Sequence, residues 1–269
     1  MPMKKFVVKE YEIHSDKITG SGGARFAVLS DLHGSVFGKD NEKLLEAIYR
    51  QNPDAVLIAG DIIVRSDQNT FAPSVDFLKK IVNQYPVYYS LGNHEYYFSN
   101  GGNLQNEYIS YEKQLTEAGV CFLHNKNVEF TIRGNKFTIY GLEIPMIYYR
   151  KPCSPVLKKE EVDKLIGKPE GDGFQILLAH NPGYGRAYFD WGADLILSGH
   201  YHGGVLRFGE NRGLISPQFR LFPSYCCGAF REGNRHMIVS AGLGEHTIPI
   251  RIHNPRELLA VTLFPEASV

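Results

Sequence analysis

Side chains that commonly bind metal ions follow five short apolar runs along this 269-residue chain. In chain order they are Asp31, His33, Asp61, Asn93, His94, His180, His200 and His202. Imidazole, carboxylate and amide groups together suit Mn, Fe, Zn or Ni, whereas calcium takes oxygen ligands only. Eight such groups are too many for one ion, so the pattern predicts two metal ions that share one carboxylate.

The first three apolar runs have the character of buried parallel strands. Residues 25–30, 54–60 and 87–92 are almost continuously apolar, which is typical of strands covered on both faces. Residues 41–50 and 74–84, between these runs, have the apolar spacing of amphipathic helices. The runs recur at about the length of one β–α–β unit. Ligands of open α/β sheets bind at the carboxyl ends of the strands, so these polar groups are expected at one sheet edge.

The middle of the chain is less regular. Residues 103–119 have helical spacing, and Gly134-Asn135 between two alternating segments predicts a hairpin. Residues 145–173 contain several glycines and prolines around a short charged helix, and we interpret them as a lid or an excursion from the fold. The apolar runs at 174–180 and 193–200 end at histidines, which we expect at the same sheet edge.

The last part of the chain contains two more apolar runs, residues 236–244 and 257–264. They predict two strands, which we assign to a second sheet rich in antiparallel pairs. With 43% hydrophobic residues and a formal net charge of zero, residues 1–269 fit one globular domain and not a nucleic-acid-binding protein.

Cysteine usage and hydropathy bear on the cellular compartment. The cysteines at 121, 153, 226 and 227 form no C-x-x-C pair, which favours reduced thiols in a cytoplasmic protein. The N-terminal apolar run is too short for a signal peptide, and no run approaches the roughly 20 apolar residues of a membrane span.

The ordered set D-x-H, G-D, G-N-H-E, H and G-H-x-H resembles the calcineurin-like metallophosphoesterase family over about residues 25–202. The tail from "SYCCGAF" onward is similar to bacterial phosphohydrolases that are related to phosphodiesterases and UDP-diacylglucosamine pyrophosphohydrolases. The resemblance implies an α/β fold, a four-layer αββα sandwich of two mixed sheets flanked by helices.

The resemblance also implies a role for each residue of the set. Asp31, His33 and His202 would hold one metal, and Asn93, His180 and His200 the other. Asp61 would bridge both metals and take part in catalysis. His94 would not bind metal but would face the substrate as the second catalytic residue, donating to a phosphate oxygen or protonating the leaving group.

The implied function is a dinuclear metal-dependent phosphohydrolase in which a metal-bridging hydroxide attacks phosphorus in line. The resemblance of the tail favours a phosphodiesterase or a pyrophosphohydrolase. Among the metals that suit the site, manganese is the favoured one. The alternative is a phosphomonoesterase that acts on a phosphoprotein or a small metabolite, and a non-catalytic metal-binding scaffold is a further one. The substrate class stays open between nucleotide, lipid-linked and small-molecule phosphate esters, and peripheral membrane association also stays open.

One position departs from the family pattern. Several members carry an aspartate that orients the catalytic histidine where this chain has Val64, so His94 needs another partner, such as Asp67 or a backbone carbonyl. Glu95 is expected to order its loop. Arg150 and Arg186 are candidate phosphate contacts, and Arg65 is interpreted as a solvated loop residue. Aromatic residues near 96–98, 148–149 and 184–189 either line the site or pack the loops.

Overall fold

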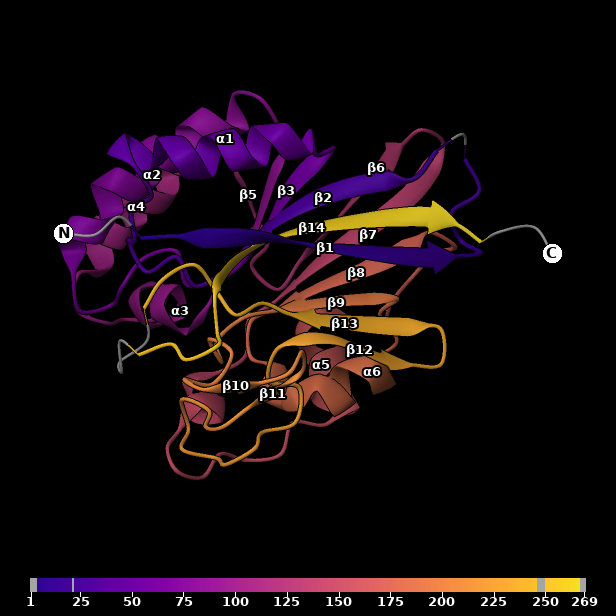
Figure 1. Ribbon diagram of the computed structural model, residues 1–269. Helices are drawn as coiled ribbons and strands as arrows, with labels where there is room; N and C mark the ends of the chain where they lie inside the picture. The colour runs from indigo at the N-terminus through magenta and orange to yellow at the C-terminus, as the bar shows by residue number, and fades with distance from the viewer. Residues whose placement is uncertain (1–3, 21, 246–249, 267–269) are drawn as a thin grey trace.

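The computed structural model describes residues 4–20, 22–245 and 250–266 (Figure 1). Within these residues two six-stranded sheets stack face to face, and helices cover their outer faces. The strand order is β1-β14-β2-β3-β4-β5 in the first sheet and β12-β13-β9-β8-β7-β6 in the second. Both sheets mix parallel and antiparallel pairs, so the expected αββα architecture is confirmed.

The first sheet carries the helices of the N-terminal half on its outer face. Its strands are β1 (Phe6–Ser15), β2 (Ala24–Leu29), β3 (Ala55–Ala59), β4 (Val87–Ser90), β5 (Cys121–Phe122) and β14 (Arg256–Pro265). The helices are α1 (Glu42–Gln51), α2 (Phe71–Val82), α3 (Asn93–Ser99) and α4 (Gln105–Glu117), with short 3₁₀ turns at Lys39–Asn41 and Gln68–Thr70.

The second sheet is built from the middle and the C-terminal part of the chain. Its strands are β6 (Asn127–Ile132), β7 (Asn135–Leu142), β8 (Phe174–Ala179), β9 (Leu195–Ser198), β12 (Gly228–Glu232) and β13 (Arg235–Val239). Helices α5 (Lys159–Ile166) and α6 (Gly185–Trp191) cover it, 3₁₀ turns lie at Met146–Tyr149 and Pro182–Tyr184, and a small ribbon pairs β10 (Arg207–Phe208) with β11 (Arg212–Gly213).

Strand alternation explains how two sheets and two helical layers pack. On β2, Ala27 and Leu29 belong to the core beneath the helices, while Phe26 and Val28 belong to the core between the sheets. Successive side chains of a strand point to opposite faces, so a strand buried on both faces reads as a continuous apolar run. A third core lies between the second sheet and its helices and contains Trp191, which is fully buried.

Several sequence predictions are confirmed and two are wrong. The predicted helices at 41–50, 74–84 and 103–119 correspond to α1, α2 and α4, and all four cysteines carry free thiols. The hairpin is present, although its turn is Arg133–Gly134, one residue earlier than expected, with positive φ at both positions.

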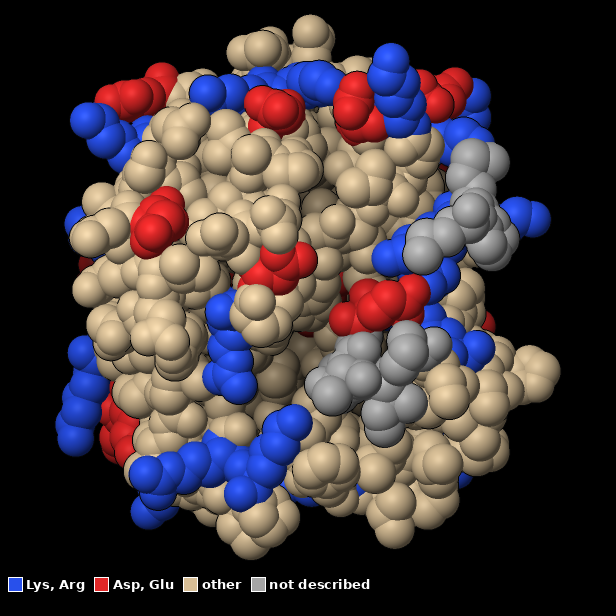
Figure 2. All heavy atoms as spheres, turned by 90° about the vertical axis from the view of Figure 1, so that its left-hand side faces the viewer, with Lys and Arg blue, Asp and Glu red and all other residues tan. Residues whose placement is uncertain are grey.

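The first wrong prediction concerns the tail, whose two strands do not share a second sheet. β13 joins the second sheet, while β14 inserts between β1 and β2 of the first. The second wrong prediction concerns β8 and β9, which belong to the second sheet, so the five ligand-bearing runs come from two sheets and not from one edge. Sheet membership depends on pairing between distant segments, which the local apolar pattern does not encode. The strand ends of both sheets open on the face that Figure 2 views, which is hollowed near its centre.

Candidate metal centre

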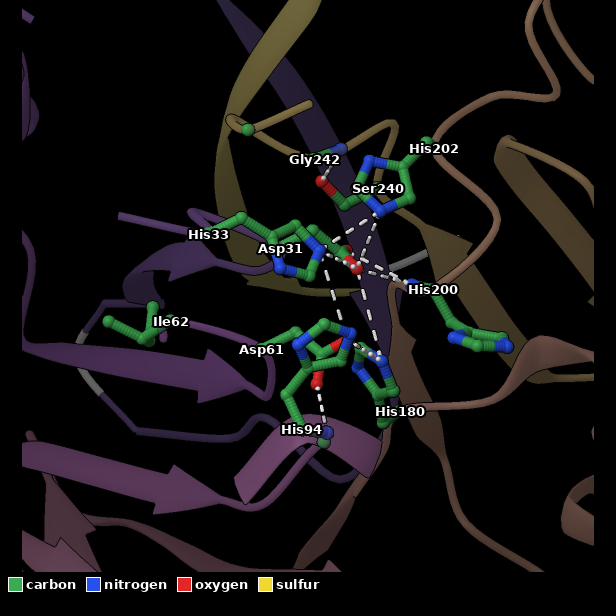
Figure 3. A network of polar contacts seen from close by, with 12 residues as sticks. Asp31, His33, Asp61, Ile62, His94, His180, His200, His202, Ser240 and Gly242 are labelled. Carbon is green, nitrogen blue, oxygen red and sulfur yellow. Dashed lines mark hydrogen bonds and ion pairs between the residues drawn. The ribbon is translucent and has the colours of Figure 1, made fainter. Parts of the chain in front are cut away.

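All eight predicted residues meet where the carboxyl ends of the two sheets converge. The loops after β2 and β3 supply Asp31, His33 and Asp61, the first turn of α3 supplies Asn93 and His94, and the loops after β8 and β9 supply the three later histidines. Figure 3 shows Asp31, His33, Asp61 and His180 clustered together, with His94 and His202 beside them. Among the described residues, three groups of His and Asp side chains have ligand atoms that all lie within 4.8 Å of one another.

One group contains Asp31, His33 and His202. His202 Nε2 lies 3.4 Å from Asp31 Oδ1 and 3.2 Å from His33 Nε2. His33 Nε2 is in turn 3.8 Å from Asp31 Oδ1. Three ring and carboxylate atoms therefore converge on one small volume, as the ligands of one cation do.

A second group contains Asp61, His180 and His200. His180 Nε2 lies 3.0 Å from Asp61 Oδ2, and the same carboxylate oxygen is 3.8 Å from His33 Nε2 in the first group. Asp61 thus lies between the two groups, and a third group, with His33, Asp61 and His94, overlaps both.

Asn93 adds an amide oxygen to this set. Its Oδ1 atom is buried and has no hydrogen-bond partner among the residues that the structure describes. A buried, unpaired amide oxygen is costly unless something binds it. A nitrogen and oxygen donor set with one orphaned oxygen fits the divalent cations that the sequence pattern predicts.

The backbone at the site adopts an uncommon conformation. Asp31, His33, Asp61, His200 and His202 all have positive φ, between 47° and 66°. Residues other than glycine seldom adopt this left-handed conformation, and it persists only where the surrounding structure enforces it. Five strained residues in one cluster indicate that ligand orientation is maintained at the expense of backbone energy.

Glu95 holds the loop that carries Asp61. This fully buried carboxylate accepts hydrogen bonds from the backbone N–H groups of Asp61, Ile62 and Ile63 and from the Tyr89 hydroxyl. It also accepts from the N–H of Gly92. The expectation that Glu95 orders its loop is consistent with these contacts.

Two glycines allow the strand ends to approach this closely. A β-carbon on Gly92 would collide with Asp61 Oδ1, and one on Gly199 would collide with Asp31 Oδ2. Because no side chain stands there, each carboxylate can reach a backbone N–H. Asp61 Oδ1 accepts from the His94 N–H, and Asp31 accepts from the His200 N–H. Any larger residue at either glycine would displace a candidate ligand.

Backbone partners distinguish His180 from His94. His180 Nδ1 lies 2.6 Å from the carbonyl oxygen of Ala59, so it must donate, and Nε2 is the atom that would bind a metal once it has lost its proton. His94 Nδ1 instead accepts from the backbone N–H of Arg65 at 3.0 Å. The neutral His94 ring therefore carries its proton on Nε2, the atom that lies 3.9 Å from Asp61 Oδ2.

This contact with Arg65 orients His94 in a chain that has Val64 where several family members have the orienting aspartate. The donor is a backbone amide in the loop after β3. Asp67 accepts from the Asn69 N–H and caps a 3₁₀ turn. The sequence offers no signal for the contact between Arg65 and His94, because any residue other than proline at position 65 supplies the same N–H.

Sequence reasoning missed Gln218. It is buried, comes from the long loop after β11, and places its amide nitrogen 2.6 Å from His200 Nε2. With the amide turned by half a rotation, its oxygen would accept from His200 Nε2–H and leave Nδ1 for a metal. Arg251 is a second missed neighbour, with Nη2 3.4 Å from His202 Nδ1, too long to fix that ring's proton.

The electrostatics of the cluster suit a cation. Burial opposes the charge on Asp61, but His180 and His94 hold the pKa of Asp61 well below its usual range. Burial opposes the charge on His180 too, yet Asp61 raises the pKa of His180 to about 10. Burial lowers the pKa of His33 to about 4. A metal that binds His180 would therefore displace a proton and replace the imidazolium as the partner of Asp61.

A cavity of about 470 Å³ opens above the cluster. Arg65, Tyr149 and Lys151 line it, so the predicted excursion at 145–173 contributes part of its wall. Arg186, one of the candidate phosphate contacts, pairs instead with Asp190 and Glu232. Arg150, the other candidate phosphate contact, is not among the described residues that line the cavity, whereas its neighbour Lys151 is.

One histidine that matches no motif forms a link of its own. His124 Nε2 lies 2.9 Å from Glu112 on α4, and its Nδ1 lies 2.9 Å from Glu143, which follows β7. The hydrogen bonds to Glu112 and then to Glu143 raise the pKa of His124 to about 10. An imidazolium thus joins the helical layer of the first sheet to the second sheet.

The sequence of this chain is similar to those of proteins named as metallophosphoesterases. A provisionally named metallophosphoesterase of Caenorhabditis elegans is 27% identical over 98% of this chain and 51% of its own length. An uncharacterized metallophosphoesterase of Helicobacter pylori J99 is 27% identical over 96% of this chain and 64% of its own length. The uncharacterized metallophosphoesterase YkuE of Bacillus subtilis is 26% identical over 94% of this chain and 84% of its own length. The chain thus spans about half to two thirds of the first two relatives.

Solved structures show the same fold at low identity. A provisionally named 5'-nucleotidase from Staphylococcus aureus aligns with a TM-score of 0.52 and 17% identity over 82% of this chain and 49% of that one. A Thermus thermophilus sulfate thiohydrolase aligns with a TM-score of 0.50 and 14% identity over 85% and 53%. Among the described residues, no helix is both long and apolar enough to cross a bilayer.

Residues 24–204 match the family model of the calcineurin-like phosphoesterases, and this range includes all eight candidate residues. Together with the His and Asp clusters, the match indicates divalent metal binding and supports a metal-dependent phosphoesterase. The chain belongs to the calcineurin-like phosphoesterase family.

Proposed function

We propose that this chain is a dinuclear metal-dependent phosphohydrolase that cleaves phosphodiester or pyrophosphate bonds. The observation that carries the proposal is the pair of ligand groups, Asp31–His33–His202 and Asp61–His180–His200, with the Asp61 carboxylate between them. One group would hold each cation, Asn93 would complete the second, and Asp61 would contact both. Manganese is the favoured metal, since the donors mix nitrogen with oxygen and include no thiolate.

When bound, two such cations supply an activated water and neutralise charge on the phosphoryl oxygens. His94 would donate a hydrogen bond from Nε2–H to a phosphate oxygen, because the backbone N–H of Arg65 occupies Nδ1 and fixes the neutral ring with its proton on Nε2. Arg65 and Lys151, which also line the cavity, would attract the phosphate, in contrast to our interpretation of Arg65 as a solvated loop residue.

The preference for a diester or a pyrophosphate rests on the tail resemblance and on space. A diester carries a substituent on each side of phosphorus, and the cavity of about 470 Å³ leaves room beyond a single phosphate group. A phosphomonoesterase remains the alternative, and a metal-binding scaffold without activity is the third candidate.

The test uses metal-stripped protein reloaded separately with Mn, Zn, Ni and Fe. Elemental analysis is expected to give two ions per chain, and bis-(p-nitrophenyl) phosphate is expected to be cleaved faster than p-nitrophenyl phosphate. His94→Ala is expected to keep both ions and lose about 10²–10³-fold in kcat, the usual cost of removing one hydrogen-bond donor to the transition state. His14→Ala, an exposed histidine on β1, serves as the control.

Each other outcome selects a different candidate. Faster cleavage of the monoester would favour the phosphomonoesterase. Two bound ions without turnover of either compound would favour the scaffold. One bound ion per chain would contradict the dinuclear centre, whatever the activity.

A further inference from the structure

An apolar groove lies directly beside the metal centre. It is a shallow groove lined mainly by Tyr201, Val205, Ile215, Phe219 and Ile250. His202 and Pro217 line both this groove and the metal cavity. A molecule in the groove would therefore contact His202, one of the candidate metal ligands.

The groove opens among exposed apolar side chains, which we call the apolar rim. The rim comprises Phe208, Phe219, Leu221, Phe222, Ile250 and Ile252, each between 46% and 66% exposed. Its members are neighbours, since the rings of Phe208 and Phe222 lie 6.3 Å apart and Leu221 pairs with the groove residue Ile215. A cluster of large apolar side chains left in water usually marks a binding surface.

Positively charged side chains lie close to the apolar rim. Residues 211–225 include Arg212 and Arg220 but no Asp or Glu. Lys151 lies 5.3 Å from the ring centre of Phe219, and it also lines the metal cavity. In Figure 2 the lower right of this face is uncharged surface, and Lys and Arg side chains gather at its lower left. Apolar side chains flanked by cations match the chemistry of an anionic lipid surface.

We propose that the apolar rim contacts a lipid surface and that the groove receives the apolar chain of an amphipathic phosphate ester. The inference rests on the proposed function, because it places the ester's phosphate in the metal cavity. A chain lying along the groove past His202 brings the attached phosphate to the candidate ligands, since both spaces share that wall.

A lipid surface fits the geometry better than a second copy of this chain. The groove must stay open for a substrate that enters from the rim side, and a lipid layer both covers the rim and supplies such substrates. The cations beside the rim would face each other across a symmetric dimer, which like charges oppose.

The lipid contact is tested with metal-free protein, so that the result does not depend on catalysis. Sedimentation with mixed phosphatidylcholine–phosphatidylglycerol vesicles is expected to show binding that weakens at high salt. The double variant Leu221→Ser, Phe222→Ser is expected to lose at least tenfold in partitioning, because these side chains are two thirds exposed and their removal leaves the core intact. Ile109→Ser, an exposed apolar residue on α4, is the matched control and is expected to bind normally.

No vesicle binding by the unaltered chain, or equal loss in the Ile109 variant, would overturn the lipid contact. Concentration-dependent dimerisation that the double variant abolishes, without vesicle binding, would assign the rim to a second copy and overturn it as well.

The groove is tested with alkyl p-nitrophenyl phosphate diesters of increasing chain length, below their aggregation concentrations. KM is expected to fall by up to about fourfold per added methylene until the groove is filled. Ile250→Asn is expected to flatten this dependence while leaving the methyl ester unaffected. Hydrolysis independent of chain length would overturn the groove assignment and leave the proposed function standing. No hydrolysis of any ester would overturn the proposed function and the groove assignment together, while vesicle binding would still decide the lipid contact.

Discussion

The two halves of the metal centre are held in place by different means. The half on the first sheet, from Asp31 to His94, is held by one buried carboxylate, Glu95, which bonds the backbone around Asp61. The half on the second sheet depends on the loop after β11, where Gln218 contacts His200. The first half is thus held by a buried carboxylate within that half. In the second half, His200 contacts a surface loop that also carries part of the apolar rim.

The largest effect is expected at the residue that both halves share. Asp61→Asn removes the charge that both ligand groups face, so binding of both metals and kcat are expected to fall, kcat by about 10³-fold. Elemental analysis and steady-state kinetics measure the two effects. Asp190→Asn, an exposed carboxylate on α6, is the control. Retention of two tightly bound ions in the Asp61 variant would show that the halves do not share it.

The next effect breaks the first half alone. Glu95→Gln replaces a carboxylate oxygen with a donor that faces backbone N–H groups, which leaves buried donors unpaired. The unfolding free energy of the metal-free protein is expected to fall by about 3–5 kcal/mol, measured by urea denaturation. Glu46→Gln on the surface of α1 is expected to change it by less than about 0.5 kcal/mol. A similar small change at Glu95 would refute its role in holding the Asp61 loop.

A smaller effect is expected in the second half. Gln218→Leu removes the partner of His200 and is expected to weaken one of the two metal sites by about 10–100-fold. Chelator competition resolves the two sites without reference to activity. Gln218→Glu keeps an acceptor for His200 Nε2–H and is expected to retain the affinity. Equal weakening of both sites would mean that the loop positions more than His200.

The smallest effect concerns the link at His124, between the helical layer of the first sheet and the second sheet. Its pKa, raised to about 10 when folded, exceeds the unfolded value of about 6.5. The stability that it provides is therefore complete below about pH 6.5 and is lost as pH rises through about 10. Because the ring is partly exposed, we expect only about 1 kcal/mol.

The measurement is the difference in unfolding free energy between the unaltered chain and His124→Gln from pH 6 to 10.5. That difference is expected to shrink as pH rises, while the exposed His253→Gln shows no such trend. A difference that is constant with pH would mean that the imidazolium does not carry the link.

The sequence predicted the first half well because its information is local. Asp31, Asp61 and Asn93 each come two or three residues after the end of a strand, and the helices between them set their spacing. Strand periodicity and the ordered motifs were therefore enough to bring these residues together. The same motifs identified His180, His200 and His202, although their strands lie in the other sheet.

The parts that the sequence did not predict depend on contacts between distant segments. β1 reads as an ordinary polar terminus, and it is a strand because it pairs with residues about 250 positions later. Gln218 lies in a loop whose sequence has no periodic pattern. His94 accepts from a backbone amide, which cannot be recognised from the type of side chain at that position. Such partners are fixed by packing in three dimensions, which residue type alone does not specify.

The position of β14 has a consequence for how the protein is made. β14 lies between β1 and β2, so β1 has no neighbour in its sheet until residues 256–265 have left the ribosome. His202 is synthesised earlier, by about 3–13 s at roughly 5–20 residues per second. During that interval the nascent chain holds every ligand for its metals but keeps an open edge at β2, where other chains can add. The addition of β14 therefore sets the moment at which the edge of β2 is covered and β1 becomes the edge strand of the sheet.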